Sequence, residues 1–157
     1  GYVLASPLAG WGSKQWPIAN YGRLAALLLK EEGLPLVING APAALPQLAA
    51  ASGALLHASS LAGLIGATRR ATAVVGIDSG PLHLAAALGK TGVAIYGPTD
   101  PDRNGPYGNS IAVLREPGTP VSYKRRPDPD SSMRAVTPEM VLEALCAGLR
   151  RGEGARA

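Results

Sequence analysis

The sequence has few of the features that identify several large protein classes. Its only cysteine, Cys146, excludes an internal disulfide and a cysteine-cluster metal site, and is expected to pack as a small hydrophobe. No apolar run approaches the roughly 20 residues that span a bilayer. There is no Gly-x-Gly-x-x-Gly after the first predicted strand, no Gly-x-x-x-x-Gly-Lys-Ser/Thr loop and no Gly-x-Ser-x-Gly elbow. These absences disfavour a dinucleotide dehydrogenase, a phosphate-loop NTPase and an elbow-type serine hydrolase.

The composition fits a single globular domain with a weakly basic surface. The 157 residues are 46% hydrophobic, carry a net charge of +4 and contain no internal repeat or low-complexity block. The basic residues gather at Arg69-Arg70, Lys124-Arg125-Arg126 and Arg150-Arg151. Because no aromatic platform or recognised binding motif accompanies them, we predict no nucleic-acid partner. These groups would suit an anionic ligand or a membrane surface.

Short apolar runs alternate with helical patterns along most of the chain. Strand-like runs cover residues 2–6, 34–39, 54–57, 73–77, 92–96 and 111–114. Helical patterns cover residues 18–32, 43–52, 61–70, 82–88 and a last helix opened by Thr137-Pro138-Glu139. Residues 115–136 show no period, and we expect an irregular connection there. The alternation predicts an α/β fold with a Rossmann-like, doubly wound parallel sheet, which binds ligands at the carboxyl ends of its strands.

The stretch over residues 73–89 has the pattern of a buried strand, a tight turn and a helix. Asp78 follows the strand, and Ser79 or Gly80 is placed to cap a helix whose first position suits Pro81. A helix amino terminus at a strand end is a common phosphate site. Asp78 would accept bonds from sugar hydroxyls there, and His83 would donate to a phosphate oxygen. Equally open is that Asp78 only caps the helix and that His83 bonds to backbone.

Two further segments fall on the same predicted edge of the sheet. Lys14 lies in the loop between the first strand and the first helix, where it either contacts phosphate or is simply solvated. Trp16 is expected to be a packing anchor. Residues 97–108 form a long loop dense in turn residues, and such loops are more often functional than idle.

Several of these segments together resemble glycosyltransferase family 9, the ADP-heptose:lipopolysaccharide heptosyltransferases. The resemblance covers most of residues 1–150 and lies in the donor-binding half of that family. It rests on the Lys14-Gln-Trp-Pro17 signature, on Asp78-Ser-Gly-Pro-Leu-His83 and the helix to Gly89, on Val93-Ala-Ile-Tyr-Gly-Pro-Thr-Asp-Pro101 and on Gly105-Pro-Tyr-Gly108.

The resemblance implies the C-terminal half of a two-domain GT-B glycosyltransferase that is inverting and needs no metal or other cofactor. Residues 1–150 would bind the nucleotide-sugar donor, and residues 151–157 would be a disordered tail. Because the chain begins inside a predicted strand without methionine, we expect it to be part of a longer protein. The acceptor domain would lie upstream, bind the lipopolysaccharide core and supply the general base, so the isolated chain would be inactive. A cytoplasmic location follows, and peripheral contact with the inner face of the inner membrane is left open.

The family pattern also implies roles for particular residues. Lys14 would neutralise diphosphate charge, and Ser79 and Gly80 would bind phosphate through backbone N–H groups. Asp78 would bind the sugar, with His83 close by. The same wall of the site would be shaped by Thr99 and Asp100.

Two departures from the family pattern leave alternatives open. Ala43 and Ala44 stand where some members place an acidic residue that binds the ribose. The loop over residues 9–12 lacks the hydroxyl side chains that some members use on phosphate, so Ser13 or backbone groups would substitute. Another nucleotide sugar, a non-catalytic α/β phosphate-binding module and a sugar-nucleotide epimerase are the other readings, although His57 is poorly sited for the last.

Overall fold

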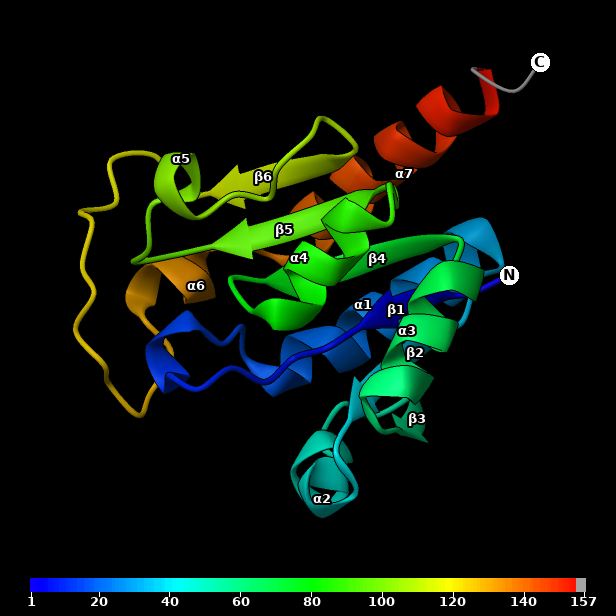
Figure 1. The fold of residues 1–157 in the computed structure, drawn as a ribbon, viewed down its shortest axis with the longest axis horizontal. Helices are drawn as coiled ribbons and strands as arrows, with labels where there is room; N and C mark the ends of the chain where they lie inside the picture. Colours follow the sequence, from blue (N-terminus) through cyan, green and yellow to red (C-terminus); the bar gives the residue numbers. More distant parts are fainter. Residues whose placement is uncertain (155–157) are drawn as a thin grey trace.

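The backbone of residues 1–154 and the side chains of residues 1–151 are described by the structure, a computed structural model (Figure 1). Its centre is one sheet of six parallel strands in the order β3-β2-β1-β4-β5-β6. The strands are β1 (Val3–Ala5), β2 (Leu36–Gly40), β3 (Leu55–Ala58), β4 (Ala73–Ile77), β5 (Gly92–Tyr96) and β6 (Ile111–Arg115). The predicted doubly wound parallel sheet is thereby confirmed.

The strand order places a topological switch point between β1 and β4. The chain winds outward from β1 through β2 to β3, then returns to β4 beside β1 and winds the other way. Leu4 of β1 pairs with Val37 on one side and with Val74 on the other. Ligands of open α/β sheets bind outside the carboxyl ends of the strands at such a point. The fold therefore directs attention to the residues that follow β1 and β4.

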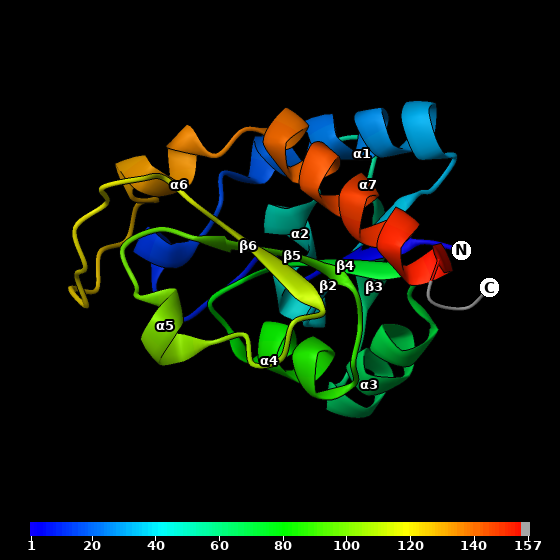
Figure 2. The same cartoon turned by 90° about the horizontal axis from the view of Figure 1, so that it is seen from above.

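Helices cover both faces of the sheet, as the view from above shows (Figure 2). On one face lie α1 (Ile18–Glu32) and α7 (Pro138–Gly154), and on the other lie α3 (Leu61–Arg70) and α4 (Gly80–Ala87). Each face has its own apolar cluster, built around Leu24, Leu28 and Val141 on the first and around Leu64 and Leu82 on the second. The chain thus carries a core on each side of the sheet.

The predicted ends of several elements agree with the structure. Gly33 ends α1 with a φ of 66°, a left-handed conformation that favours glycine, and Ser60 Oγ accepts a bond from the Gly63 N–H at the start of α3. Ser79 is the N-cap of α4 as predicted, whereas Pro81 occupies the second helical position and not the expected first, which is taken by Gly80. Cys146 is buried as expected, and it also donates to Glu32 Oε1 at 2.9 Å. Burial and the neighbouring Glu32 raise the pKa of the Cys146 thiol to about 11.

The helix expected over residues 43–52 is wrong. A 3-10 turn, η2 (Pro42–Ala44), is followed by only four residues of helix, α2 (Leu45–Leu48), and the chain then turns at Gly53, whose φ is 88°. Pro46 lacks the backbone N–H that would bond to the Pro42 carbonyl, so α2 begins only after the 3-10 turn, with Pro46 in its first turn, where proline is tolerated. No side chain of η2 is buried against the sheet.

The irregular connection expected over residues 115–136 is only partly confirmed. It contains the helix α6 (Ser131–Ala135), which buries Met133 against the first core. Similarly, the loop after β5 contains α5 (Pro101–Asn104). At the other end, α7 continues to Gly154, and the remainder of the predicted tail, residues 155–157, lies outside the described residues. Within residues 1–154, no helix combines the length and apolar character that a bilayer crossing requires.

Replacing Asp130 by alanine is expected to lower the free energy of unfolding by about 1 kcal/mol, the usual value of an N-cap. Asp130 Oδ1 accepts bonds from the N–H of Ser132 at 3.0 Å and from its hydroxyl at 2.7 Å, and Oδ2 pairs with Arg126. The Ser132 bonds, with Arg126, hold the Asp130 pKa below its usual range. A depressed carboxyl pKa stabilises the fold at neutral pH, and this contribution is lost as pH falls through the folded-state value.

The contribution of Asp130 is measured by urea unfolding of the unchanged chain and of Asp130→Ala, at pH 7 and at a pH below the ordinary carboxyl pKa of about 4. The difference should shrink at the lower pH, whereas Asp128→Ala, at an exposed site in the same segment, should change little at either pH. A difference that persists undiminished in acid would contradict the assigned cause.

Candidate functional site

Asp78 is the centre of a polar cluster at the switch point. It follows directly on β4, and its side chain is only 7% exposed. Its Oδ2 accepts from Lys14 Nζ at 3.3 Å and from Asn104 Nδ2 at 3.0 Å, while Oδ1 lies 3.7 Å from His83 Nε2. Lys14 follows β1, His83 is in α4 and Asn104 ends α5. Three segments that are far apart in sequence, around residues 14, 78–83 and 104, therefore meet at one carboxylate.

Lys14 is held between this carboxylate and an aromatic ring. It ends the 3-10 turn η1 (Gly12–Lys14), whose geometry is fixed by bonds from the Lys14 N–H to Trp11 and from the Gln15 N–H to Gly12. The ammonium lies 4.6 Å from the centroid of the Trp11 ring, and Arg125 lies 5.1 Å from the same centroid. Cations at these distances are attracted to the ring. Trp11 thus draws two positive charges to the edge where Asp78 lies.

The amino terminus of α4 is open in front of Gly80. The carbonyl of Ser79 accepts from the N–H groups of Leu82 and His83, which begins the helix, and helix geometry leaves the first N–H groups without intrahelical partners. A methyl group built on Gly80 would meet no atom within 4 Å. Ser79 Oγ is buried, makes no cap bond and has no partner among the described residues. A phosphate oxygen could therefore approach the Gly80 N–H.

Two more hydroxyls near this edge are buried without a partner among the described residues, those of Tyr96 and Thr99. Burial, together with the Asp78 carboxylate, raises the pKa of Tyr96. The phenol therefore stays protonated and remains a donor. Unpaired buried hydroxyls are uncommon in folded proteins, so their occurrence at and just after the carboxyl end of β5 agrees with a site that is completed by a ligand.

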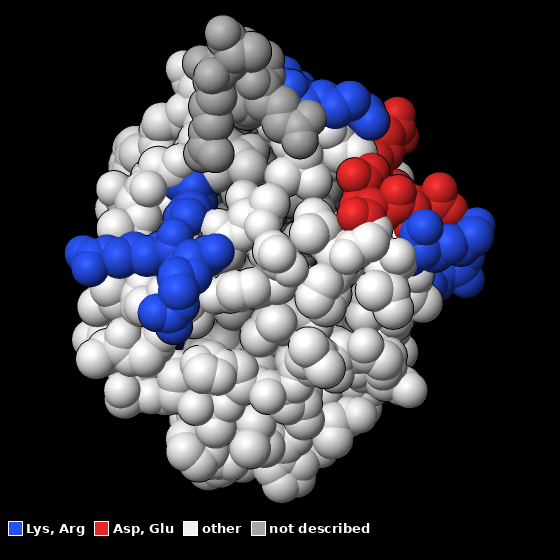
Figure 3. Space-filling model, turned by 90° about the vertical axis from the view of Figure 1, so that its right-hand side faces the viewer, with Lys and Arg blue, Asp and Glu red and all other residues white. Residues whose placement is uncertain are grey.

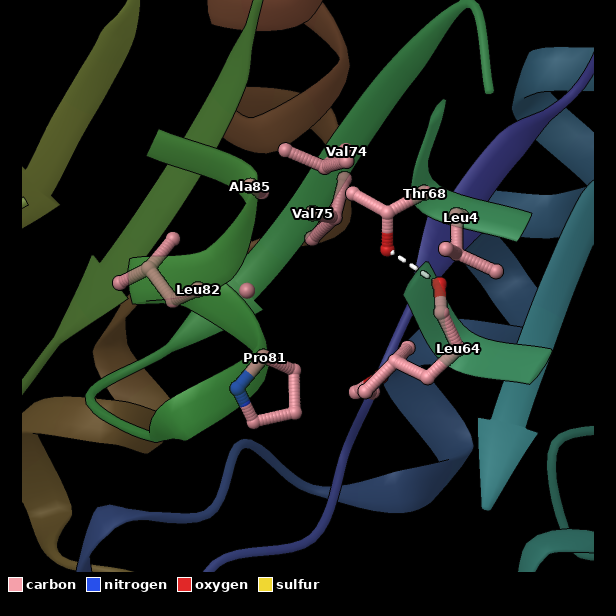
Figure 4. A pocket seen from close by; sticks show the side chains of 10 residues that line it. Leu4, Leu64, Thr68, Val74, Val75, Pro81, Leu82 and Ala85 are labelled. Atoms are coloured by element: carbon pink, nitrogen blue, oxygen red, sulfur yellow. Dashed lines mark hydrogen bonds between the residues drawn. The ribbon is translucent and has the colours of Figure 1, made fainter. Parts of the chain in front are cut away.

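Two other hollows in the molecule contain none of the four residues of this cluster. A crevice of about 10 Å³ under α4, lined by Leu64, Leu82 and other side chains, has room for one water at most (Figure 4). A larger hollow of about 750 Å³ is lined by Arg70, Lys90 and Arg151 at the amino ends of the strands. Figure 3 shows basic side chains gathered on that face of the molecule, which is the edge opposite Asp78.

The family model for glycosyltransferase family 9 (heptosyltransferase) matches residues 1–132. The chain belongs to glycosyltransferase family 9. Curated relatives of this family 9 chain include the lipooligosaccharide heptosyltransferase 2 of Haemophilus influenzae, which is 30% identical over 148 residues and is matched over 85% of this chain and 42% of the relative. The lipopolysaccharide heptosyltransferase 2 of Escherichia coli K12 is 34% identical over 161 residues, with 90% and 44% covered.

Solved structures of heptosyltransferases also match this family 9 chain. The E. coli ADP-heptose lipopolysaccharide heptosyltransferase II matches with a TM-score of 0.82 at 29% identity, over 97% of this chain and 47% of that one. The E. coli heptosyltransferase WaaC with ADP matches with a TM-score of 0.76 at 27% identity, over 94% and 44%. The family 9 chain thus spans less than half the length of these relatives.

Some of the predicted site residues of this family 9 chain lie together around Asp78, and others make hydrogen bonds that hold the surrounding loops and helices in place. Lys14, Asp78 and His83 meet directly, with Ser79 and Gly80 next to them in the chain. Asp100 Oδ1 caps α5 by accepting from the Asp102 N–H. Ser13 is fully buried, its hydroxyl donates to the Lys124 carbonyl at 3.4 Å, and its backbone pairs with Arg126 and Asp130. The alternative that Asp78 caps α4 is not realised, because Ser79 is the N-cap.

Sequence reasoning missed Asn104, Trp11 and Arg125. The density of turn residues in 97–108 indicated a functional loop, but no period fixes which of its side chains faces Asp78. Trp11 was considered only within a loop that lacks hydroxyl groups, although an aromatic residue three positions before a lysine was the available signal. Arg125 lies in the segment 115–136, which shows no periodic pattern, so the sequence does not indicate that it packs over Trp11.

Proposed function

We propose that this chain is the donor-binding part of an inverting heptosyltransferase, which transfers heptose from ADP-heptose to the lipopolysaccharide inner core. The single observation that carries the proposal is the cluster of Lys14, Asp78 and His83 at the open start of α4, at the switch point of the sheet. Family membership supports the choice of a nucleotide sugar over other phosphorylated ligands. The E. coli relative WaaC, whose structure holds ADP, supports the choice of base.

The diphosphate of the donor lies at the head of α4. The Gly80 N–H and the positive end of the helix dipole face it, and Lys14 supplies a full charge from the other side. When the bond between the anomeric carbon and the phosphate oxygen breaks, its electron pair stays on the diphosphate. Donors that are already oriented stabilise this growing charge. The acceptor hydroxyl attacks from the opposite face, which inverts the anomeric centre.

Asp78 and His83 face the sugar rather than the base. The Asp78 oxygen that is not bonded to Lys14, Oδ1, accepts from a sugar hydroxyl, and His83, whose side chain is 41% exposed, lies beside it. The proton of the acceptor hydroxyl goes to a base in an upstream acceptor domain. That domain holds the lipopolysaccharide core at the cytoplasmic face of the inner membrane, and the chain described here supplies only donor binding.

Calorimetric titration of this chain with ADP, UDP and GDP tests the proposal. Selective binding of ADP is expected, and Arg70→Ala, which removes one positive charge at the opposite edge of the sheet, should bind ADP as the unchanged chain does. Preference for UDP or GDP would overturn the assignment of ADP-heptose. The absence of any binding at millimolar nucleotide, in a sample shown to be folded by circular dichroism, would overturn the assignment of donor binding to this chain.

A further inference from the structure

Asn104 donates a hydrogen bond to Asp78 from the end of α5, a short helix that is fixed by its own hydrogen bonds. The four residues of α5 are capped at one end by Asp100, and the Asn104 N–H donates to the Asp100 carbonyl at 2.9 Å. The Gly105 N–H closes the turn on Pro101 at 2.9 Å. From this frame Asn104 Nδ2 donates to Asp78 Oδ2 at 3.0 Å. Asp100 itself makes no hydrogen bond to Asp78, but by capping α5 it holds Asn104 in the position from which Asn104 donates to Asp78.

The two oxygens of the Asp78 carboxylate have different surroundings. Oδ2 accepts from both Lys14 and Asn104, whereas Oδ1 accepts no side-chain hydrogen bond from the described residues and lies 3.7 Å from His83 Nε2. The amide of Asn104 therefore fixes the rotation of the carboxylate and leaves Oδ1 toward the open side. Asn104 is an uncharged amide, so its bond to Asp78 does not change the charge of the site.

We propose that Asn104 is a positioning residue that keeps the Asp78 carboxylate bonded when Lys14 turns to the diphosphate of the donor. This inference rests on the proposed function. In the structure, Lys14 and Asn104 both donate to Oδ2 of Asp78. If Lys14 contacts phosphate and Asn104 is absent, the Asp78 carboxylate, which is 7% exposed, loses both of its side-chain donors. Leaving a buried charge without a hydrogen-bond donor is costly. Asn104 lowers that cost, so it favours the bound state without touching the ligand.

The test is a double-mutant cycle on ADP affinity, measured by calorimetry with Asn104→Ala in the unchanged chain and in the Asp78→Ala chain. Because hydrogen bonds to charged groups are the strong ones, Asn104→Ala should weaken ADP binding about tenfold in the first background. It should have no effect in the second, where there is no carboxylate to hold. Asn104→Asp, which keeps the shape but sets a second carboxylate against the first, should weaken binding more than alanine does. Asn109→Ala, at an exposed asparagine of the opposite edge, is the matched control.

Equal weakening in both backgrounds would overturn the proposal, because Asn104 would then act on the fold or on the ligand itself. So would undiminished affinity of Asn104→Ala in the first background. Nuclear magnetic resonance of the Asn104 side-chain amide separates this failure from failure of the proposed function. If the unchanged chain binds no nucleotide, the proposed function fails, and the positioning is then judged on the amide signals without ligand. A shift of these signals in Asp78→Ala supports the contact, and unchanged signals refute it.

Discussion

Replacing Trp16 by alanine is expected to lower the free energy of unfolding by about 3–5 kcal/mol, the usual cost of removing a large buried aromatic side chain. Trp16 is 1% exposed, packs edge-on against Tyr21 with ring centroids 4.8 Å apart, and donates from Nε1 to the Val136 carbonyl at 2.8 Å. Val136 lies between α6 and α7, so this one side chain ties the Lys14 loop to the C-terminal helix. The variant therefore loses packing, a buried hydrogen bond and the anchor of the loop.

Two further variants keep this prediction testable if Trp16→Ala does not fold. Trp16→Phe retains most of the packing but leaves the Val136 carbonyl unpaired, which should cost about 1–3 kcal/mol. Trp11→Ala is the matched control, because Trp11 is only partly buried and contacts two cations, a contribution of about 0.5–1 kcal/mol each at exposed sites. Urea unfolding followed by circular dichroism at 222 nm, about the wavelength of the helix signal, avoids reliance on tryptophan emission. Equal losses for the two alanine variants would contradict the role of Trp16 as an anchor.

The sheet was predictable because its central strands β4 and β5 are buried on both faces. Residues 73–77 and 92–96 are apolar without alternation, and both are fully buried strands in the structure. The start of α4 was predictable from Pro81 and the small residues before it. Residues 43–52 form a shorter helix than predicted, because Pro46 lacks the N–H that would continue the turn from Pro42 into one regular helix.

The site was predictable only in part, because proximity at a sheet edge does not fix contacts. The order of strands and helices placed Lys14 and Asp78 on one edge, and the structure joins them although 64 residues separate them. The contact of Asn104 with Asp78 could not be predicted from the sequence, because the direction of the Asn104 side chain depends on the cap of α5 by Asp100. The packing of residues 124–130 on the Gly12 loop is made largely by backbone, and a methyl group on Gly12 would overlap the Pro127 carbonyl oxygen. Backbone contacts of this kind leave no side-chain pattern in a sequence.

Replacing Lys14 by methionine is expected to weaken ADP binding by about 10- to 100-fold, which corresponds to the loss of hydrogen bonds to a charged group. Under the proposed function, the change removes the counter-charge of the diphosphate. It also leaves the Asp78 carboxylate next to the proposed phosphate site, with Asn104 as its remaining hydrogen-bond donor among the described residues. The loss therefore has two parts, one from missing attraction and one from new repulsion between the carboxylate and the diphosphate.

The double variant Lys14→Met/Asp78→Asn separates the two parts. Neutralising Asp78 removes the repulsion, so the double variant should bind ADP several-fold more tightly than Lys14→Met, yet more weakly than the unchanged chain. Added salt should weaken ADP binding to the unchanged chain more than to the double variant, because screening acts on the Lys14 charge. Arg70→Met, which removes a charge at the far edge, should match the unchanged chain. If Lys14→Met binds ADP normally, the lysine does not contact phosphate. If the double variant binds as weakly as Lys14→Met, Asp78 does not face the diphosphate and its pairing with Lys14 serves the fold alone.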